Sequence, residues 1–160
     1  MGYRSQVACS ISVDRTRTEG EDGKVRWVYD KDKFKEMIGF IKLSRFYELW
    51  SRDSDKDSIG WRDGKFVMYG EGWKWYPDYE DVRAFHDMFN AMSDIEGISG
   101  HFLRVGEESG DVDEDSFGDE PDWDLFHSFS AISFDGQDYL GKRTTDDEEP
   151  QAQDATNPQS

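Results

Sequence analysis

Residues 7–13 have the sequence VACSISV, in which apolar side chains alternate with small or polar ones. A period of two is typical of a strand with one face against a core, because successive side chains of a strand point to opposite faces. We therefore predict a first strand here, with Val7, Cys9, Ile11 and Val13 facing the core.

The residues that follow predict helices able to cover this strand. Turn residues at 14–24 lead into Val25–Tyr29 and favour a hairpin. Asp30 or Asp32 can cap a first helix, a short apolar cluster follows Ser44, and Pro77 with Asp78 can start a second helix that ends at Gly97 or Gly100. The residues expected to be buried in the two helices fall at spacings of three and four: Phe34, Met37, Ile38, Ile41, Val82, Phe85, Phe89 and Met92.

Aromatic and branched residues predict the remaining strands. Phe66–Tyr69 and Trp73–Tyr76, separated by glycines, are interpreted as a hairpin or as one bent strand with a glycine bulge. His101–Gly106 and Phe126–Phe134 are predicted as two further strands, with the acidic residues 107–124 between them as a loop.

This order of elements predicts an α+β fold, with two helices packed on a mostly antiparallel sheet in a ferredoxin-like sandwich. Residues 1–140 are expected to form a single domain. Residues 141–160 are polar and charged, and they lack large apolar side chains. We predict that they form a disordered acidic C-terminal tail.

The net charge of -17 is unevenly placed along the 160 residues. Residues 1–106 hold 19 acidic and 17 basic side chains, whereas residues 107–160 hold 17 acidic and 2 basic ones. Such a field repels nucleic acid and anionic lipid and attracts cationic protein surfaces. Direct nucleic-acid binding is therefore disfavoured, although an acidic segment can also serve solubility alone.

The sequence predicts a protein that is neither secreted nor membrane-spanning. A single cysteine, Cys9, excludes an internal disulfide framework, no signal peptide opens the chain, and no apolar stretch approaches the roughly 20 residues of a membrane-spanning helix. We expect a reducing cytoplasm as the location.

Residues suited to catalysis are few, and no motif joins them. Cys9 lies on the apolar alternation of the first strand and is interpreted as an inert core thiol. The three histidines, His86, His101 and His127, are spread over different predicted elements. We therefore predict no catalytic residues and no enzyme.

The sequence also gives only weak signs of a metal or nucleotide site. Asp-x-Asp-x-Asp occurs at 53–57 and at 111–115, but serine stands where a calcium loop turns on glycine, and the twelfth positions lack the bidentate glutamate. Gly70-Glu71-Gly72 lacks the lysine and helix start of a phosphate-binding loop. The prediction is no metal site and no cofactor.

Two groups of residues are candidates for binding. The first is the acidic stretch 107–124 with one tryptophan, predicted to contact a basic partner protein: Glu107, Glu108, Asp111, Asp113, Glu114, Asp115, Asp119, Glu120, Asp122, Trp123 and Asp124. Trp123 is expected either to anchor a partner or to fold back over the sheet. The second group, Arg4, Trp75, Tyr76 and Arg104, is a candidate pocket for a small ligand.

Three segments resemble a group of small bacteriophage-encoded proteins: MGYRSQV at 1–7, WKWYPDYEDV at 73–82 and FLRVGEESGD at 102–111. These proteins begin with Met-Gly-Tyr-Arg-Ser and share Lys-Trp-Tyr, Tyr-Glu-Asp-Val and Arg-(Val/Ile)-Gly-Glu-Glu patterns. The resemblance departs at residues 14–29 and at the acidic tail. It implies a phage accessory protein in the cytoplasm of an infected bacterium, and it carries no activity with it.

Three hypotheses of function follow. The first is a phage protein that inhibits a host defence or nucleic-acid-handling protein, its acidic surface imitating nucleic acid. The second is a sponge or sensor for a nucleotide or metabolite, and the third is a virion assembly component that associates with itself. The oligomeric state is left open.

Overall fold

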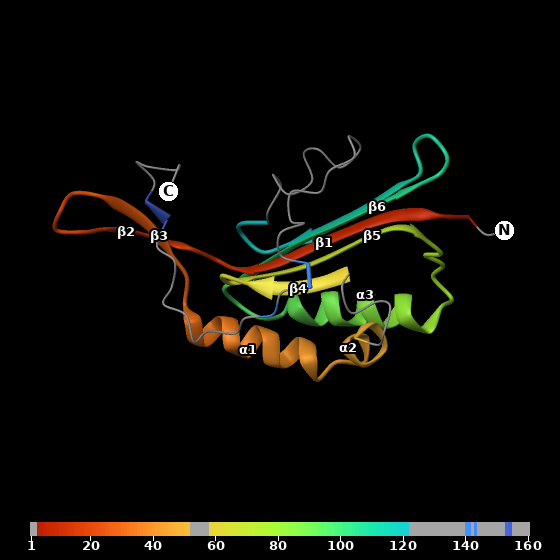
Figure 1. The fold of residues 1–160 in the computed structure, drawn as a ribbon, viewed down its shortest axis with the longest axis horizontal. Coiled ribbons are helices and arrows are strands. Elements are labelled where there is room, and N and C mark those ends of the chain that lie inside the picture. Colours follow the sequence, from red (N-terminus) through yellow and green to blue (C-terminus); the bar gives the residue numbers. More distant parts are fainter. Residues whose placement is uncertain (1–2, 52–57, 122–139, 142, 144–152, 155–160) are drawn as a thin grey trace.

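The computed structural model describes residues 3–51, 58–121, 140–141, 143 and 153–154. Its centre is a five-stranded antiparallel sheet in the order β4-β5-β1-β6-β7, with all three helices on one face (Figure 1). The fold is therefore α+β, as predicted.

The main sheet is built around the predicted first strand. β1 (Ser5–Val13) pairs with β5 (Lys65–Trp73) on one side and with β6 (Ile98–Gly106) on the other. β4 (Ile59–Arg62) and β7 (Val112–Phe117) form the two edges. Without β7, the order of the other four strands and their helical connections is that of a ferredoxin-like sandwich.

The predicted hairpin is confirmed as β2 (Thr16–Glu19) and β3 (Val25–Val28), which stand apart from the main sheet at one end of the molecule (Figure 1). β8 (Gln153–Asp154) pairs with β3. The rest of the predicted tail, except residues 141 and 143, lies outside the described residues.

Helix formation follows the predicted apolar spacing, and of the two candidate caps for the first helix the structure uses Asp30. α1 (Lys31–Lys42) begins after Asp30, whose carboxylate accepts hydrogen bonds from two backbone amides of the first turn. The hydroxyl of Ser44 accepts one backbone amide, that of Tyr47, at the start of α2 (Arg45–Trp50). α3 (Glu80–Met92) begins after Tyr79, later than the predicted start at Pro77 and Asp78. The helical residues predicted to be buried are buried.

The structure departs from the sequence predictions at four places. β4 had not been predicted. Trp75 and Tyr76 lie beyond the end of β5, which forms one strand with a bulge at its glycines, so the hairpin alternative fails. α3 ends at Met92, well before Gly97. The predicted loop at 107–124 contains β7, and the strand predicted at 126–134 lies outside the described residues.

Apolar side chains fill the space between the sheet and the helices. The residues of β1 predicted to face the core, Val7, Cys9, Ile11 and Val13, are all buried in this layer together with Trp61, Phe66 and Phe102. The opposite face of the sheet carries a smaller apolar cluster, in which Leu140 packs against Ala8 and Val67. The helical layer thus supplies the main core and leaves β7 at the rim.

Candidate functional site

Among the acidic residues predicted to bind a partner, those up to Glu120, which the structure describes, are arranged along one edge of the sheet. We call residues 107–120 the acidic edge; it contains eight acidic residues and no basic one. Glu107 and Glu108 lie in the turn after β6, Asp113, Glu114 and Asp115 lie on β7, and Asp119 and Glu120 follow it. All of these seven side chains are exposed, and only the eighth, Asp111, is partly buried.

An apolar contact holds the C-terminal end of β7 in place. Phe117 lies across from Gly100 of β6, where a Cβ atom would come within 2.4 Å of the phenyl ring. The same ring packs edge to face against Phe89 of α3, with 5.0 Å between ring centroids. The glycine therefore allows Phe117 to reach the main core and fasten the strand to it.

An ionic contact holds the N-terminal end. The guanidinium of Arg104 on β6 donates hydrogen bonds to Asp111 (2.6 Å) and to Asp113 (2.8 Å). It also donates one of 3.0 Å to the hydroxyl of Ser5 on β1. Arg104 is only 8 % exposed, but the side chains of Asp111 and Asp113 are 34 % and 66 % exposed, so water reaches these bonds and makes them weaker than those of a fully buried ion pair.

Tyr3 adds further hydrogen bonds to the same cluster of side chains. Its hydroxyl donates to Asp111 (2.5 Å) and accepts from the backbone amide of Glu108 (2.8 Å), while its own backbone amide donates to the hydroxyl of Tyr76 (2.6 Å). The bonds from Arg104 and Tyr3 lower the pKa of Asp111, and the bond to Asp111 raises the pKa of Tyr3. The carboxylate of Asp111 is thus kept charged.

Residues from the segments 1–7, 73–82 and 102–111 meet at this cluster of side chains. The first supplies Tyr3, the second supplies Tyr76, and the third supplies Arg104 and Asp111. A further bond runs from the Arg4 amide to the carboxylate of Glu107 (2.8 Å). Segments far apart in the sequence are therefore joined by polar contacts that define one end of the sheet.

Two histidines lie near the acidic edge, on opposite faces of the sheet. His101 on β6 forms a 2.6 Å hydrogen bond to Glu114 of β7, on the face away from the helices. His86 lies on α3 and faces Phe102. Burial lowers the pKa of His86, and the charges of Asp115 and Asp113 oppose that shift. Since burial dominates, His86 adds little positive charge to the acidic edge at neutral pH.

Carboxylates follow one another along β7 at the spacing of its backbone. Asp113, Glu114 and Asp115 are consecutive, and a strand rises about 3.4 Å per residue. One strand of B-DNA carries one phosphate per about 3.4 Å of helix axis. Successive side chains of a strand point to opposite faces, so Asp113 and Asp115 share one face and Glu114 lies on the other. Each face of β7 therefore presents charge at roughly half the density of one DNA strand.

The four candidate residues for a small ligand gather at the same end of the sheet, but their polar groups face other parts of the protein. Arg104 is engaged by Asp111 and Asp113, and Trp75 is 7 % exposed within the main core. Arg4 donates to the Gly72 carbonyl (2.9 Å). A cavity of about 250 Å³ beside Arg4 is also lined by Glu71 and Glu107.

The residues suited to catalysis are separated by the sheet. Cys9 faces the helices, and burial raises the pKa of its thiol well above the ordinary value. Its neighbour Ser10 is the residue that pairs with His101, so Cys9 and His101 point to opposite faces. His127 lies outside the described residues.

The structure describes only one of the two Asp-x-Asp-x-Asp sequences. In the one at 111–115, the guanidinium of Arg104 already binds Asp111 and Asp113, while 53–57 falls in the part of the chain without a described structure. Among the residues that the structure describes, no group of three or more His, Cys, Asp or Glu side chains is placed to hold a metal ion.

Sequence reasoning missed how β7 is fastened. Gly100 was interpreted as a helix end and Arg104 as a ligand contact, whereas both hold β7 to the sheet. Val112 and Phe117, apolar residues at the two ends of β7, were the available signal. Asp122, Trp123 and Asp124 lie outside the described residues, so their predicted role stays a prediction.

No family model, no curated protein and no solved structure matches this chain. None of the helices in the described ranges is long and apolar enough to cross a membrane.

Proposed function

We propose that the protein binds a cationic surface of another protein through the acidic edge. The observation that carries the proposal is that residues 112–117 form a paired strand at the rim of the sheet, with both ends fastened to the core. A fixed row of carboxylates needs little ordering on binding, which favours association. The net charge of -17 adds long-range attraction for a basic partner.

The row of exposed carboxylates favours a partner that normally holds nucleic acid. A groove built for phosphates binds a row of negative charges, and the exposed acids of the acidic edge form such a row along β7 and the turns at its two ends. Together with the resemblance to small phage proteins, this supports an inhibitor of a host defence or nucleic-acid-handling protein in an infected bacterium. The acidic edge then acts as a nucleic-acid mimic.

The arrangement gives less support to the alternative that the protein is a sponge or sensor for a nucleotide or metabolite. A nucleotide or other anionic metabolite in the cavity beside Arg4 would meet the carboxylates of Glu71 and Glu107. Like charges at that distance oppose phosphate binding.

A pull-down from bacterial lysate tests the proposal. The bait is the full chain, at low and at high salt, and the informative variant is the triple substitution Glu108→Gln, Asp115→Asn and Asp119→Asn. These exposed acids do not hold Arg104 or His101 in place, so the fold is expected to survive. A basic nucleic-acid-binding protein should be captured by the wild type, released by salt or by added duplex DNA, and lost with the triple variant.

A control variant with the same total charge shows whether binding depends on the position of the acids or on the net charge alone. Glu19→Gln, Glu21→Gln and Glu96→Gln remove the same three charges from exposed positions far from β7 in the sequence. The control should capture the partner as the wild type does. Equal loss of capture with both triple variants would mean that net charge alone attracts the partner, and the acidic edge would have no specific role.

A further inference from the structure

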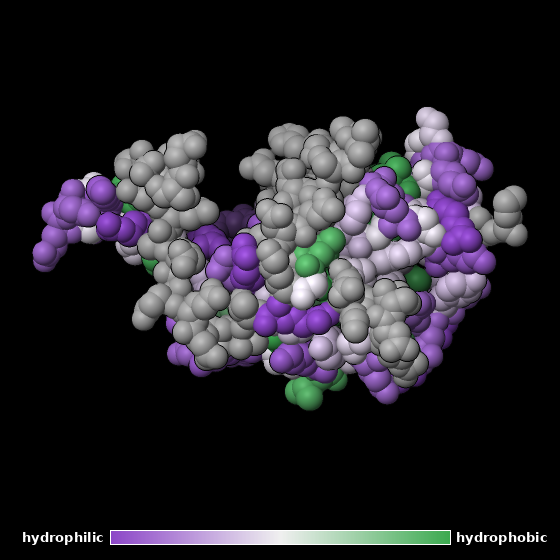
Figure 2. Space-filling view, in the orientation of Figure 1, coloured by the Kyte–Doolittle hydropathy of each residue, from purple (hydrophilic) through white to green (hydrophobic). Residues whose placement is uncertain are grey.

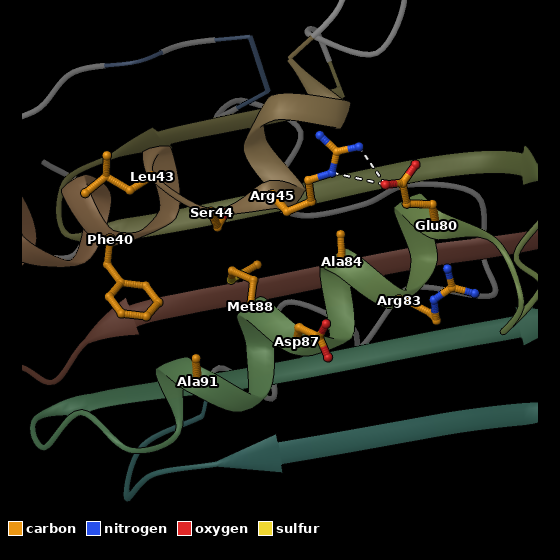
Figure 3. Close-up of a pocket in the computed structure, with 10 residues that line it drawn as sticks. All are labelled: Phe40, Leu43, Ser44, Arg45, Glu80, Arg83, Ala84, Asp87, Met88 and Ala91. Atoms are coloured by element: carbon orange, nitrogen blue, oxygen red, sulfur yellow. Dashed lines mark hydrogen bonds and ion pairs between the residues drawn. The ribbon is translucent and has the colours of Figure 1, made fainter.

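A groove on the helical layer takes no part in the partner binding proposed for the acidic edge. It lies between the end of α1 and the length of α3 and has a volume of about 520 Å³ (Figure 3). Its floor is formed by Ala84 and Met88 of α3, both buried, and Ala91 lies one turn further along. We call this cavity and its rim the helical groove.

Two large apolar side chains stand exposed at the rim of the helical groove. Phe40 is 40 % exposed and Leu43 is 90 % exposed. Figure 2 shows an apolar patch projecting from the helical side of the molecule, at the lower edge of the view. Covering a leucine is worth about 2 kcal/mol, so the exposed position of Leu43 favours contact with a second surface.

Gly39 adds independent support for such a contact. It lies inside α1, four residues before Leu43 and thus on the same side of the helix. A Cβ atom at Gly39 would meet no other atom within 4 Å, so packing within the chain does not require glycine there. Glycine inside a helix costs about 1 kcal/mol relative to alanine, and it leaves room for a close approach from outside.

The charges at the rim identify the kind of surface that fits. Two are basic, Arg45 and Arg83, and two are acidic, Glu80 and Asp87, so the helical groove is neutral on a chain of charge -17. Arg45 and Glu80 already pair across the groove at 2.6 Å (Figure 3). A strongly basic partner would gain little here, in contrast with the acidic edge.

We propose that the helical groove is the interface of a homodimer. In a two-fold dimer the same patch meets itself, which requires a patch with balanced charges. Arg83 and Asp87 lie four residues apart on α3, about 6 Å along its axis. When two α3 helices run antiparallel, Arg83 of one copy faces Asp87 of the other. Leu43 of each copy then fills the space above the alanines of its partner.

The salt response of the dimer is opposite to that of the proposed partner complex. Two copies each of charge -17 repel one another at long range, and salt screens that repulsion. The dimer should therefore become tighter as salt rises, whereas binding of a cationic protein to the acidic edge should become weaker. Failure of one proposal thus leaves the other open to its own test.

Sedimentation velocity over a range of protein concentrations, at low and at high salt, tests the dimer. We expect a species of twice the monomer mass that grows with concentration and with salt. Leu43→Ser should weaken dimerisation at least about tenfold, because each dimer loses two buried leucines. Its side chain is exposed in the monomer, so folding should not change. Trp27→Ser, on the β2–β3 hairpin, is the matched control for removal of an exposed apolar side chain.

Charge exchange at the rim makes the test specific to the two-fold arrangement. Arg83→Glu and Asp87→Arg should each weaken the dimer, because each variant places like charges opposite one another. The double variant restores the opposite charges and should recover the wild-type dimer. A wild type that stays monomeric at all concentrations, or a Leu43→Ser variant that dimerises as the wild type does, would overturn the proposal.

Discussion

The two ends of β7 are held to the rest of the protein by different kinds of force. At the N-terminal end, the buried Arg104 binds Asp111 and Asp113 through charged hydrogen bonds. At the C-terminal end, the ring of Phe117 packs on Gly100 and Phe89, and just beyond it the amide of Glu120 donates to the Ser99 hydroxyl. The exposed carboxylates between them contribute few of these contacts. A strongly acidic strand can therefore be rigid, provided that residues at its ends supply the stability.

Removal of Arg104 should have the largest effect on stability. We expect Arg104→Met to lower the free energy of unfolding by about 2 kcal/mol, because it leaves Asp111 and Ser5 without this donor; the loss is less than for a fully buried pair because Asp113 is largely exposed. Urea unfolding measures the change. Arg45→Met removes the exposed ion pairs with Glu48 and Glu80 and should cost much less; equal losses would show that Arg104 has no special structural role.

Truncation of Phe117 tests the apolar end. Phe117→Ala should lower the free energy of unfolding by about 1–2 kcal/mol, since the ring is only partly buried. Hydrogen exchange should show faster exchange of the β7 amides near residue 117 than near residue 112. If the whole strand loses protection equally, the two ends of β7 are not independent.

Acid should weaken the ionic contacts at the N-terminal end of β7. The pKa of Asp111 is lower in the folded protein than its ordinary value of 3.8, first because of Arg104 and then because of Tyr3. Its charge therefore stabilises the fold above pH 3.8, and this contribution is lost as the pH falls through the lowered pKa. Urea unfolding should show wild type more stable than Asp111→Asn at pH 7, with the difference closing at acid pH. A difference that stays constant would contradict this assignment.

Neutralisation of the exposed acids should have the smallest effect on stability. The triple variant Glu108→Gln, Asp115→Asn and Asp119→Asn should change the free energy of unfolding by no more than about 0.5 kcal/mol, and in the stabilising direction, because like charges along the strand repel. Thermal or urea unfolding checks this. A large loss of stability would mean that these carboxylates hold the fold, and loss of partner binding in the variant would then have a trivial cause.

Local chemistry in the sequence predicted much of the fold. The alternation at 7–13 predicted β1, Asp30 was one of two candidate caps for α1, and the spacing of Val82, Phe85, Phe89 and Met92 predicted the buried side of α3. These signals depend on neighbours within a few residues, which is why they can be recognised without a structure. β4 was also accessible, because Asp63-Gly64 forms a two-residue turn with positive φ at both positions.

The sequence by itself determined that the chain has an α+β core, an excess of negative charge after residue 106, and a single buried thiol at Cys9. Only the tertiary structure decided that residues 112–117 form a strand, because their pairing partner on β6 and their anchors Arg104, Gly100 and Phe89 are supplied by other segments. The helical groove was likewise decided by the approach of α1 to α3. Strand pairing and grooves between helices depend on contacts between distant residues, and a pattern read along the chain contains no distances between them.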